Sequence, residues 1–200
     1  MKTYQALLSV AALAFATNVA QAQSPDPNGA YIQSISYGGS GSPQGSVGSS
    51  FANDRESFTL IFDVFNASSG QGVPATESRK NSQINLNYRA AKPSKLDLNF
   101  RGYVNLPAGV TATITVATYD EKGNPKLSSE TFQGPLAQDY LFSETVKLGS
   151  TKIGHGAGSA VGVRNLNVSI RVAGHQQASS LITIDSIDGQ VWTAGDGKKE

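Results

Sequence analysis

The sequence contains no cysteine, so it can form neither a disulfide nor a lipid anchor attached to a cysteine. Histidine is almost as scarce: the only two, His155 and His175, stand in segments flanked by glycine or glutamine. Zinc sites need three or four ligands, and no H-x-H or HExxH motif is present. We therefore expect both histidines to be surface residues and expect no metal site and no cofactor.

The chain also lacks an excess of either charge, with 16 Lys and Arg against 15 Asp and Glu. Nucleic-acid binders carry a basic stripe that contacts phosphates, and none occurs here, so that class is excluded. No G-x-S-x-G motif marks a serine hydrolase. Beyond the N-terminal segment, no apolar run approaches the roughly 20 residues that a membrane-spanning helix needs.

The first 22 residues have the features of a cleavable export signal. Lys2 precedes an apolar stretch over residues 6–16, and Ala20 and Ala22 form the A-x-A arrangement that signal peptidase recognises. We expect cleavage after Ala22 and a secreted or periplasmic location. In the remaining chain we expect a flexible segment at 23–30, one domain at 31–194 and a frayed tail at 195–200.

The rest of the sequence shows the period-two alternation of half-buried strands, and no stretch with a helical apolar period. Strands are predicted at residues 31–37, 57–65, 83–89, 96–101, 110–119, 127–132, 139–148, 163–172, 181–187 and 190–193. Residues 110–132 form a predicted hairpin, and Asp188-Gly189 suits a tight turn between the last two strands. About nine or ten short strands predict an all-β fold, an antiparallel β-sandwich or jelly roll.

Several segments carry a family resemblance that extends over most of residues 31–193. They are Tyr37-Gly38-Gly39-Ser40-Gly41-Ser42-Pro43-Gln44-Gly45-Ser46, Glu77-Ser78-Arg79-Lys80-Asn81-Ser82-Gln83-Ile84-Asn85-Leu86, Phe100-Arg101-Gly102-Tyr103, Phe132-Gln133-Gly134-Pro135, Asp139-Tyr140 and Leu181-Ile182-Thr183-Ile184-Asp185-Ser186-Ile187-Asp188-Gly189. The chain resembles the secreted family catalogued as domain of unknown function 4360. The resemblance implies a small exported β-rich domain and implies no activity, ligand or catalytic residue.

The chain departs from this family at its cysteines. The resemblance implies cysteines where this chain has Ser42 and Ser82, a third near residues 154–156, and a fourth after the tryptophan that corresponds to Trp192. All four are absent. Losing one disulfide typically costs a small secreted domain about 2–5 kcal/mol, so packing or assembly with a partner must compensate.

Polar motifs supply weak candidates for ligand contact. Arg79, Lys80 and Asn81 precede a strand and form either a site for a carboxylate or anionic glycan or a solvated turn. Tyr103, which follows Arg101 and Gly102, either stacks on a sugar or packs in the sheet.

Two carboxylates near the C-terminus, Asp185 and Asp188, are candidates for a calcium site. Their spacing does not match the D-x-[DN]-x-[DN]-G pattern of a calcium loop. The alternative is that Asp188 makes the tight turn with Gly189 and that Asp185 faces solvent or pairs with a neighbour.

Two functions remain open from the sequence. The favoured one is an exported non-enzymatic β-sandwich that binds an extracellular glycan, a cell-envelope component or another copy of itself. The alternative is a secreted hydrolase acting on polysaccharide, for which no catalytic residue can be assigned because the 15 acidic residues are scattered.

Overall fold

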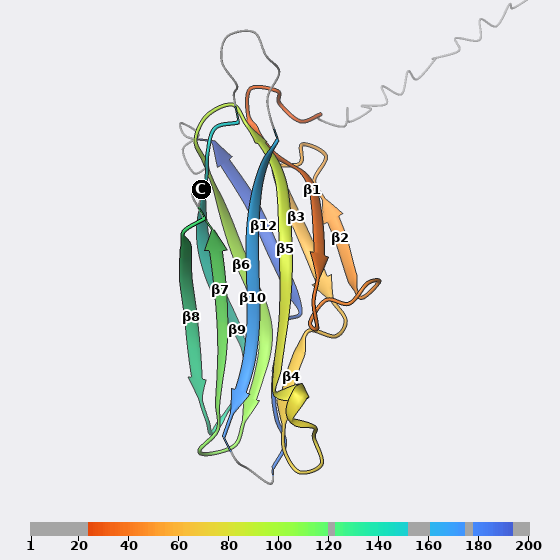
Figure 1. Cartoon of the computed structure of the whole chain (residues 1–200), viewed down its shortest axis with the longest axis vertical. Helices are drawn as coiled ribbons and strands as arrows, with labels where there is room; N and C mark the ends of the chain where they lie inside the picture. Colours follow the sequence, from red (N-terminus) through yellow and green to blue (C-terminus); the bar gives the residue numbers. More distant parts are fainter. Residues whose placement is uncertain (1–23, 120–122, 152–160, 175–177, 194–200) are drawn as a thin grey trace, which may run out of the picture.

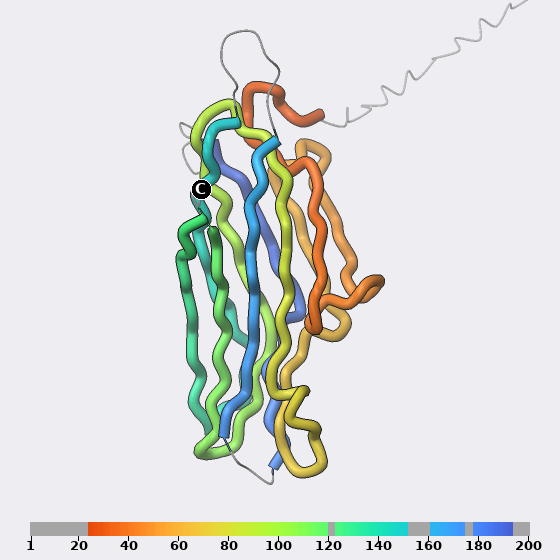
Figure 2. The backbone as a smooth tube through the Cα atoms, in the orientation of Figure 1, coloured from red at the N-terminus to blue at the C-terminus, as the bar shows by residue number. Residues whose placement is uncertain are grey.

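The structure is a computed structural model that describes residues 24–119, 123–151, 161–174 and 178–193. The predicted signal segment, its cleavage site, His155 and His175 lie outside these residues. Within them the chain forms twelve strands and one short 3-10 helix, arranged as two antiparallel sheets that face each other. Figure 1 shows the two layers, and Figure 2 follows the chain through them.

The first sheet has the strand order β1-β5-β10-β7-β8. Its strands are β1 (Ala30–Gly38), β5 (Arg79–Ala90), β10 (Gly162–Ala173), β7 (Thr111–Tyr119) and β8 (Pro125–Gln133). The 3-10 helix η1 (Ala75–Ser78) leads directly into β5. In Figure 1 this sheet is the front layer, with β8 and β1 at its two edges.

The second sheet is organised around β6, which pairs with β9 along its whole length on one edge. Its other edge pairs with β12 and then β11, while β3 and β2 extend the sheet beyond β12, and β4 beyond β11. The bounds are β2 (Val47–Phe51), β3 (Ser57–Phe62), β4 (Asn66–Ser69), β6 (Ser94–Leu106), β9 (Leu136–Leu148), β11 (Ser180–Thr183) and β12 (Ser186–Thr193).

The predicted all-β sandwich is confirmed, with more strands than the nine or ten expected. Sequence reasoning missed β2 and β4, because Val47-Gly48-Ser49-Ser50-Phe51 and Asn66-Ala67-Ser68-Ser69 hold few apolar residues. Both strands lie at edges of the second sheet, so they bury little and need no strong alternation. The predicted hairpin at 110–132 is present as β7 and β8.

The core fills the space between the sheets with alternate side chains of the long strands β5, β6, β7, β9 and β10 and with further residues of the shorter ones. On β6 the inward residues Leu96, Leu98, Phe100 and Val104 are all fully buried. Each large apolar side chain that is buried contributes about 1.5–3 kcal/mol relative to its exposed state. The ring pairs Phe62–Phe65, Phe100–Phe142 and Phe132–Tyr140 join parts of this core, with centroids 5.4, 5.8 and 4.9 Å apart.

The predicted tight turn at Asp188-Gly189 is wrong, because both residues lie inside β12. Gly189 is the register partner of Phe58 on β3, and a Cβ atom on Gly189 would come within 2.2 Å of the Phe58 ring. The glycine is therefore required by close approach of an aromatic ring across the strands. The chain instead breaks at Ile184 and Asp185, between β11 and β12.

A second close approach fixes Tyr140 of β9 in the core. Its hydroxyl donates a hydrogen bond of 2.5 Å to the Thr183 carbonyl oxygen, which would lie 2.0 Å from a Cβ on Gly102. Burial, and to a lesser extent the charges of Asp185 and Glu130, raise the pKa of the Tyr140 hydroxyl well above its ordinary value. The folded state therefore stabilises the neutral form of Tyr140 relative to the phenolate.

Ser42 and Ser82 meet in the core although 40 positions separate them in the sequence. Both are fully buried, and their Oγ atoms lie 2.5 Å apart in a hydrogen bond. These are two of the positions at which the family resemblance implies cysteines. The two side chains meet, so cysteines at positions 42 and 82 would lie close enough to form a disulfide.

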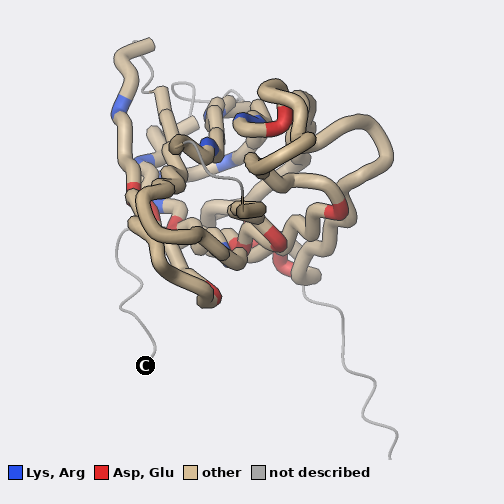
Figure 3. Tube along the Cα trace, turned by 90° about the horizontal axis from the view of Figure 1, so that it is seen from below, with Lys and Arg blue, Asp and Glu red and all other residues tan. Residues whose placement is uncertain are grey.

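In the part of the chain that the structure describes, no helix is long and apolar enough to cross a membrane. Nor do three His, Asp or Glu side chains of these residues come close enough to share a metal ion. Most of the trace in Figure 3 is uncharged, and positions of both signs occur along it.

We expect the double substitution Ser42→Cys with Ser82→Cys to form a disulfide on air oxidation. Closing a loop of this length stabilises a protein by about 4 kcal/mol in the chain-entropy estimate, so the urea midpoint should rise. Thiol titration and urea denaturation with and without dithiothreitol measure both effects. The single variant Ser42→Cys is the control, and two free thiols in the folded oxidised double variant would contradict the geometry.

We expect Tyr140→Phe to lower the free energy of unfolding by about 1 kcal/mol at neutral pH, because the Thr183 carbonyl loses its partner. The folded-state pKa of Tyr140 lies above that of an unfolded tyrosine, about 10. The stability from this residue is therefore fully present below about pH 10 and is lost as pH rises further. Denaturation at pH 8 and at about pH 11 should show the variant losing less stability than the wild type; an equal loss would refute this role.

Candidate functional site

The outward side chains of β6 form a polar row across the middle of the second sheet. Lys95, Asp97, Asn99, Arg101 and Tyr103 alternate with the buried residues of the same strand and are exposed or half-buried. Since β6 rises about 3.4 Å per residue, this row is some 27 Å long. We call it, together with the outward residues of β12 and β9 beside it, the β6 face.

The strand register places one residue of β12 and one of β9 on either side of each outward residue of β6 from Lys95 to Arg101. Trp192 of β12 and Lys147 of β9 flank Lys95, Gln190 and Thr145 flank Asp97, and Asp188 and Ser143 flank Asn99. Neighbouring strands lie about 4.8 Å apart, so each set of three forms a continuous step across the sheet. The face therefore carries an aromatic ring at one end and acids, amides and hydroxyls along its length.

Hydrogen bonds between strands hold two of these steps in place. The Thr145 hydroxyl donates to Oδ1 of Asp97 over 2.7 Å, and the Ser143 hydroxyl donates to Oδ1 of Asn99 over 2.7 Å. Each acceptor keeps further lone pairs, and the Asn99 amide keeps its two N–H donors. The polar atoms of the face are thus oriented before any ligand arrives.

Asp188 is fixed from two sides. The Thr59 hydroxyl of β3 donates to its Oδ1 over 2.7 Å, and the Arg101 Nε donates to its Oδ2 over 3.1 Å. The Arg101 side chain is 58% exposed, so this ion pair adds little to stability and leaves most guanidinium donors facing solvent.

A hollow of about 790 Å³ opens at the Trp192 end of the β6 face. We call it the Trp192 hollow; it is lined by Pro93, Ser94, Lys95, Asp97, Leu98, Asn99, Ser143, Glu144, Thr145, Lys147, Leu148, Trp192 and Thr193. Trp192 is half-buried, and its indole Nε1 is buried without a hydrogen-bond partner. Buried indole N–H groups usually have a partner, so this one is a donor that the described protein atoms leave unused.

A smaller hollow of about 330 Å³ lies on the other side of Asn99, between β2, β3 and β12. Asn99 lines both hollows, and Asp188 and Gln190 line the smaller one. The two hollows are therefore neighbours that share Asn99 as a common wall.

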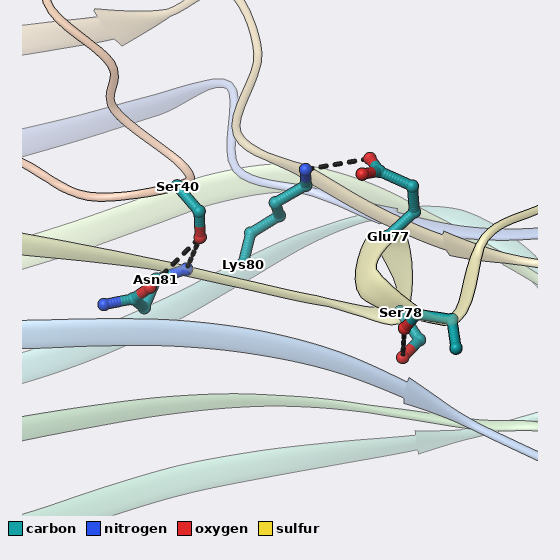
Figure 4. Close-up of polar contacts among 6 residues, drawn as sticks. Ser40, Glu77, Ser78, Lys80 and Asn81 are labelled. Carbon is teal, nitrogen blue, oxygen red and sulfur yellow. Dashed lines mark hydrogen bonds and ion pairs between the residues drawn. The ribbon is translucent and has the colours of Figure 1, made fainter.

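The candidates Arg79, Lys80 and Asn81 do not converge on a common site. Arg79 is exposed, Lys80 pairs with Glu77 over 2.8 Å, and Asn81 bonds with Ser40, whose hydroxyl donates to its Oδ1 over 3.0 Å. Figure 4 shows the Lys80 and Asn81 contacts as separate pairs. The Ser78 hydroxyl caps the turn by donating to the Ala75 carbonyl oxygen, so this motif shapes the start of β5.

The candidates Arg101 and Tyr103 lie on the β6 face, and Asp188 joins them through its contact with Arg101. Asp185 lies between β11 and β12 with an exposed side chain, and no described contact joins that side chain to Arg101, Tyr103 or Asp188. Its backbone N–H donates to the Arg101 carbonyl of β6, and its carbonyl oxygen accepts from the Phe62 N–H of β3. No third acid of the described residues completes a metal site around Asp185 and Asp188.

Sequence reasoning missed Trp192, Asp97, Asn99 and Thr145 as site residues. A signal for β6 was present, since the polar half of its alternation marks an outward face. Nothing in one sequence shows that β12 and β9 lie on either side of β6, because that follows from strand order.

Two solved structures show a likeness too low to support an argument about function. One is a carbohydrate-binding module, TmCBM61, solved with β-1,4-galactotriose, with 12% identity, a TM-score of 0.32, and coverage of 82% of this chain and 90% of that one. The other is the enzymatically active domain of tailspike protein 4 of bacteriophage CBA120, with 14% identity and a TM-score of 0.27. The second likeness covers 82% of this chain but spans only 20% of the tailspike chain.

Sequence relatives give a firmer result. An uncharacterized secreted protein of Arthroderma benhamiae is 36% identical over 169 residues, which cover 82% of this chain and 68% of that protein. The family described as a domain of unknown function, DUF4360, matches residues 28–195, and the chain therefore belongs to that family.

Proposed function

We propose that the protein is a secreted, non-catalytic module that binds a glycan chain along the β6 face. The observation that carries this proposal is Trp192, a half-buried aromatic side chain at the wall of a hollow of about 790 Å³. An indole offers an apolar plane beside a polar N–H, which suits the apolar and hydroxyl-bearing parts of a sugar ring. Its unpartnered Nε1 is a donor that a bound ligand can satisfy through a small shift of the ring.

The polar groups beside Trp192 match the hydroxyl groups of a saccharide. The carboxylate oxygens of Asp97 accept hydrogen bonds, and the amide nitrogen of Asn99 donates them. The hydroxyl oxygens of Ser143 and Thr145, whose protons are engaged by Asn99 and Asp97, can accept as well. Their mutual bonds hold them in place, so binding costs little side-chain entropy.

The length of the β6 face supports a chain rather than a single sugar as the ligand. Between Lys95 and Arg101 the outward residues of β6 extend over about 20 Å. The Trp192 hollow lies along this path, and the smaller hollow adjoins it at Asn99 on the β12 side. A linear oligosaccharide would contact Trp192 at one end and Asp188 and Arg101 at the other.

Secretion belongs to the same proposal. The features of an export signal in residues 1–22 and the 36% identical relative that is described as a secreted protein both favour it. Extracellular polysaccharides are then the ligands within reach.

Polysaccharide hydrolysis is the second candidate, because the fold brings two acids together that the sequence could not pair. Asp97 and Asp188 are diagonal neighbours on β6 and β12, which places such residues about 7–8 Å apart. Carboxyl groups of inverting glycosidases lie about 6.5–9.5 Å apart. Against catalysis, Arg101 and Thr59 hold Asp188, and Thr145 holds Asp97, as hydrogen-bond acceptors on an open face.

We expect Trp192→Ala to weaken retention of the purified protein on the glycan that binds the wild type. Truncating an aromatic anchor costs about 2 kcal/mol or more, which is a loss of about thirtyfold in affinity. Affinity electrophoresis against a panel of neutral and acidic polysaccharides identifies the glycan and measures the loss. Because Trp192 is the only tryptophan, the wild-type fluorescence should also change on binding.

The matched control is Tyr31→Ala, which removes a half-buried aromatic ring from the first sheet. It should leave retention unchanged. Retention of the Trp192→Ala variant at wild-type strength, or no glycan of the panel retained by the wild type, would refute the proposal.

The bound glycan should remain intact. Incubation with the wild type should release no reducing ends, and Asp188→Asn should alter affinity only. Reducing ends that appear with the wild type and disappear with Asp188→Asn would establish the hydrolase instead.

A further inference from the structure

A third hollow lies at the side of the sandwich, between the edge strands of the two sheets. It has a volume of about 830 Å³ and opens between the start of β8 in the first sheet and the end of β9 in the second. Its charged lining residues are Lys126, Lys147 and Arg164. We call it the side groove; β9 separates it from the Trp192 hollow, and Thr145 and Lys147 line both.

Arg164 is the unusual residue of this groove. It shares the inward side of β10 with Leu166, Val168 and Ile170, and is only 4% exposed. One amino group, Nη1, donates a hydrogen bond to the Tyr119 carbonyl oxygen, while the Nε–H is buried and has no partner. The guanidinium group therefore keeps an unused N–H donor, Nε, inside the protein.

Among the described residues, no carboxylate is found in an ion pair with Arg164. The pairs Lys80–Glu77, Arg101–Asp188 and Lys126–Glu144 do not include it. Glu144 is a buried acid that directly precedes the β9 residues of the groove, and it forms an ion pair with Lys126. Lys147 is exposed at the rim and adds a further positive charge.

A buried, unpaired guanidinium group is costly, and it is stabilised most by a carboxylate that accepts two parallel hydrogen bonds. Because Nη1 donates to the Tyr119 carbonyl, the Nε side of the guanidinium group is the side that can donate to a carboxylate. A carboxylate in the side groove would gain this contact with Arg164 and the attraction of Lys147. A neutral ligand would leave the charge uncompensated.

We propose that the side groove binds the carboxylate group of an acidic sugar, a uronic acid, with Arg164 as its main contact. The carboxylate part of this assignment rests on Arg164 alone. The sugar part rests on the proposed function, because the groove adjoins the glycan face across β9. A chain that carries uronic acids could contact the β6 face and place one carboxylate over the edge of the sheet.

The test is a nuclear magnetic resonance titration of the ¹⁵N-labelled protein with D-glucuronate, D-glucose and acetate at constant ionic strength. Arginine Nε–H groups give separate signals, and the Arg164 signal is identified by its loss in Arg164→Gln. We expect D-glucuronate to shift this signal saturably and D-glucose to leave it unchanged. Arg164→Gln should weaken glucuronate binding by about tenfold or more, as expected for a charged hydrogen bond.

Three further variants test whether glucuronate binding is specific to the side groove. Lys147→Gln changes an exposed residue, so it should keep the fold and weaken binding about threefold or more by removing one rim charge. Arg171→Gln is the matched control, because Arg171 is exposed on the opposite side of β10, and it should bind normally. Trp192→Ala should leave the Arg164 shift intact, which distinguishes failure of this site from failure of the β6 face.

An Arg164 signal that responds equally to glucose and glucuronate, or that no carboxylate shifts, would overturn the proposal. Wild-type affinity in a folded Arg164→Gln variant would do the same. Acetate binding as tight as that of glucuronate would overturn the assignment to a sugar.

Discussion

Burial of apolar side chains between the two sheets is the interaction on which the rest of this molecule depends. The core contains residues from nearly every strand, and those of β6 are among the most completely buried. Two buried hydroxyls, Ser42 and Ser82, occupy positions where the family resemblance implies cysteines. Their hydrogen bond adds about 1 kcal/mol at most, so packing, not cross-linking, has to hold the sheets together.

The same alternation that builds the core also builds the candidate site. When Leu96, Leu98 and Phe100 point inward, Lys95, Asp97, Asn99 and Arg101 must point outward in one straight row. Close packing through glycine keeps this sheet regular, since the Phe58 ring lies over Gly189 and Tyr140 reaches past Gly102. The rigid sheet then orients the polar side chains, which suits a ligand that lies along a surface.

The sequence predicted those features that depend on local pattern. Period-two alternation located the long strands β5, β6, β7, β9 and β10, because each buries one face. It missed β2 and β4, which bury little, and it misread Gly189, whose role depends on the Phe58 ring of another strand. Of the candidate site residues, Arg101, Tyr103 and Asp188 were named from the sequence and lie on the β6 face. Trp192 and Arg164 were not, because their proposed roles depend on residues of other strands that lie beside them only in the folded sheet.

Native-state hydrogen exchange tests most directly whether apolar packing holds the sandwich together. The amides of β5, β6 and β10, at the centres of the two sheets, should exchange only through global unfolding, with one common free energy. Protection confined to one sheet, or central amides of β6 that exchange through low-energy local opening, would contradict the account.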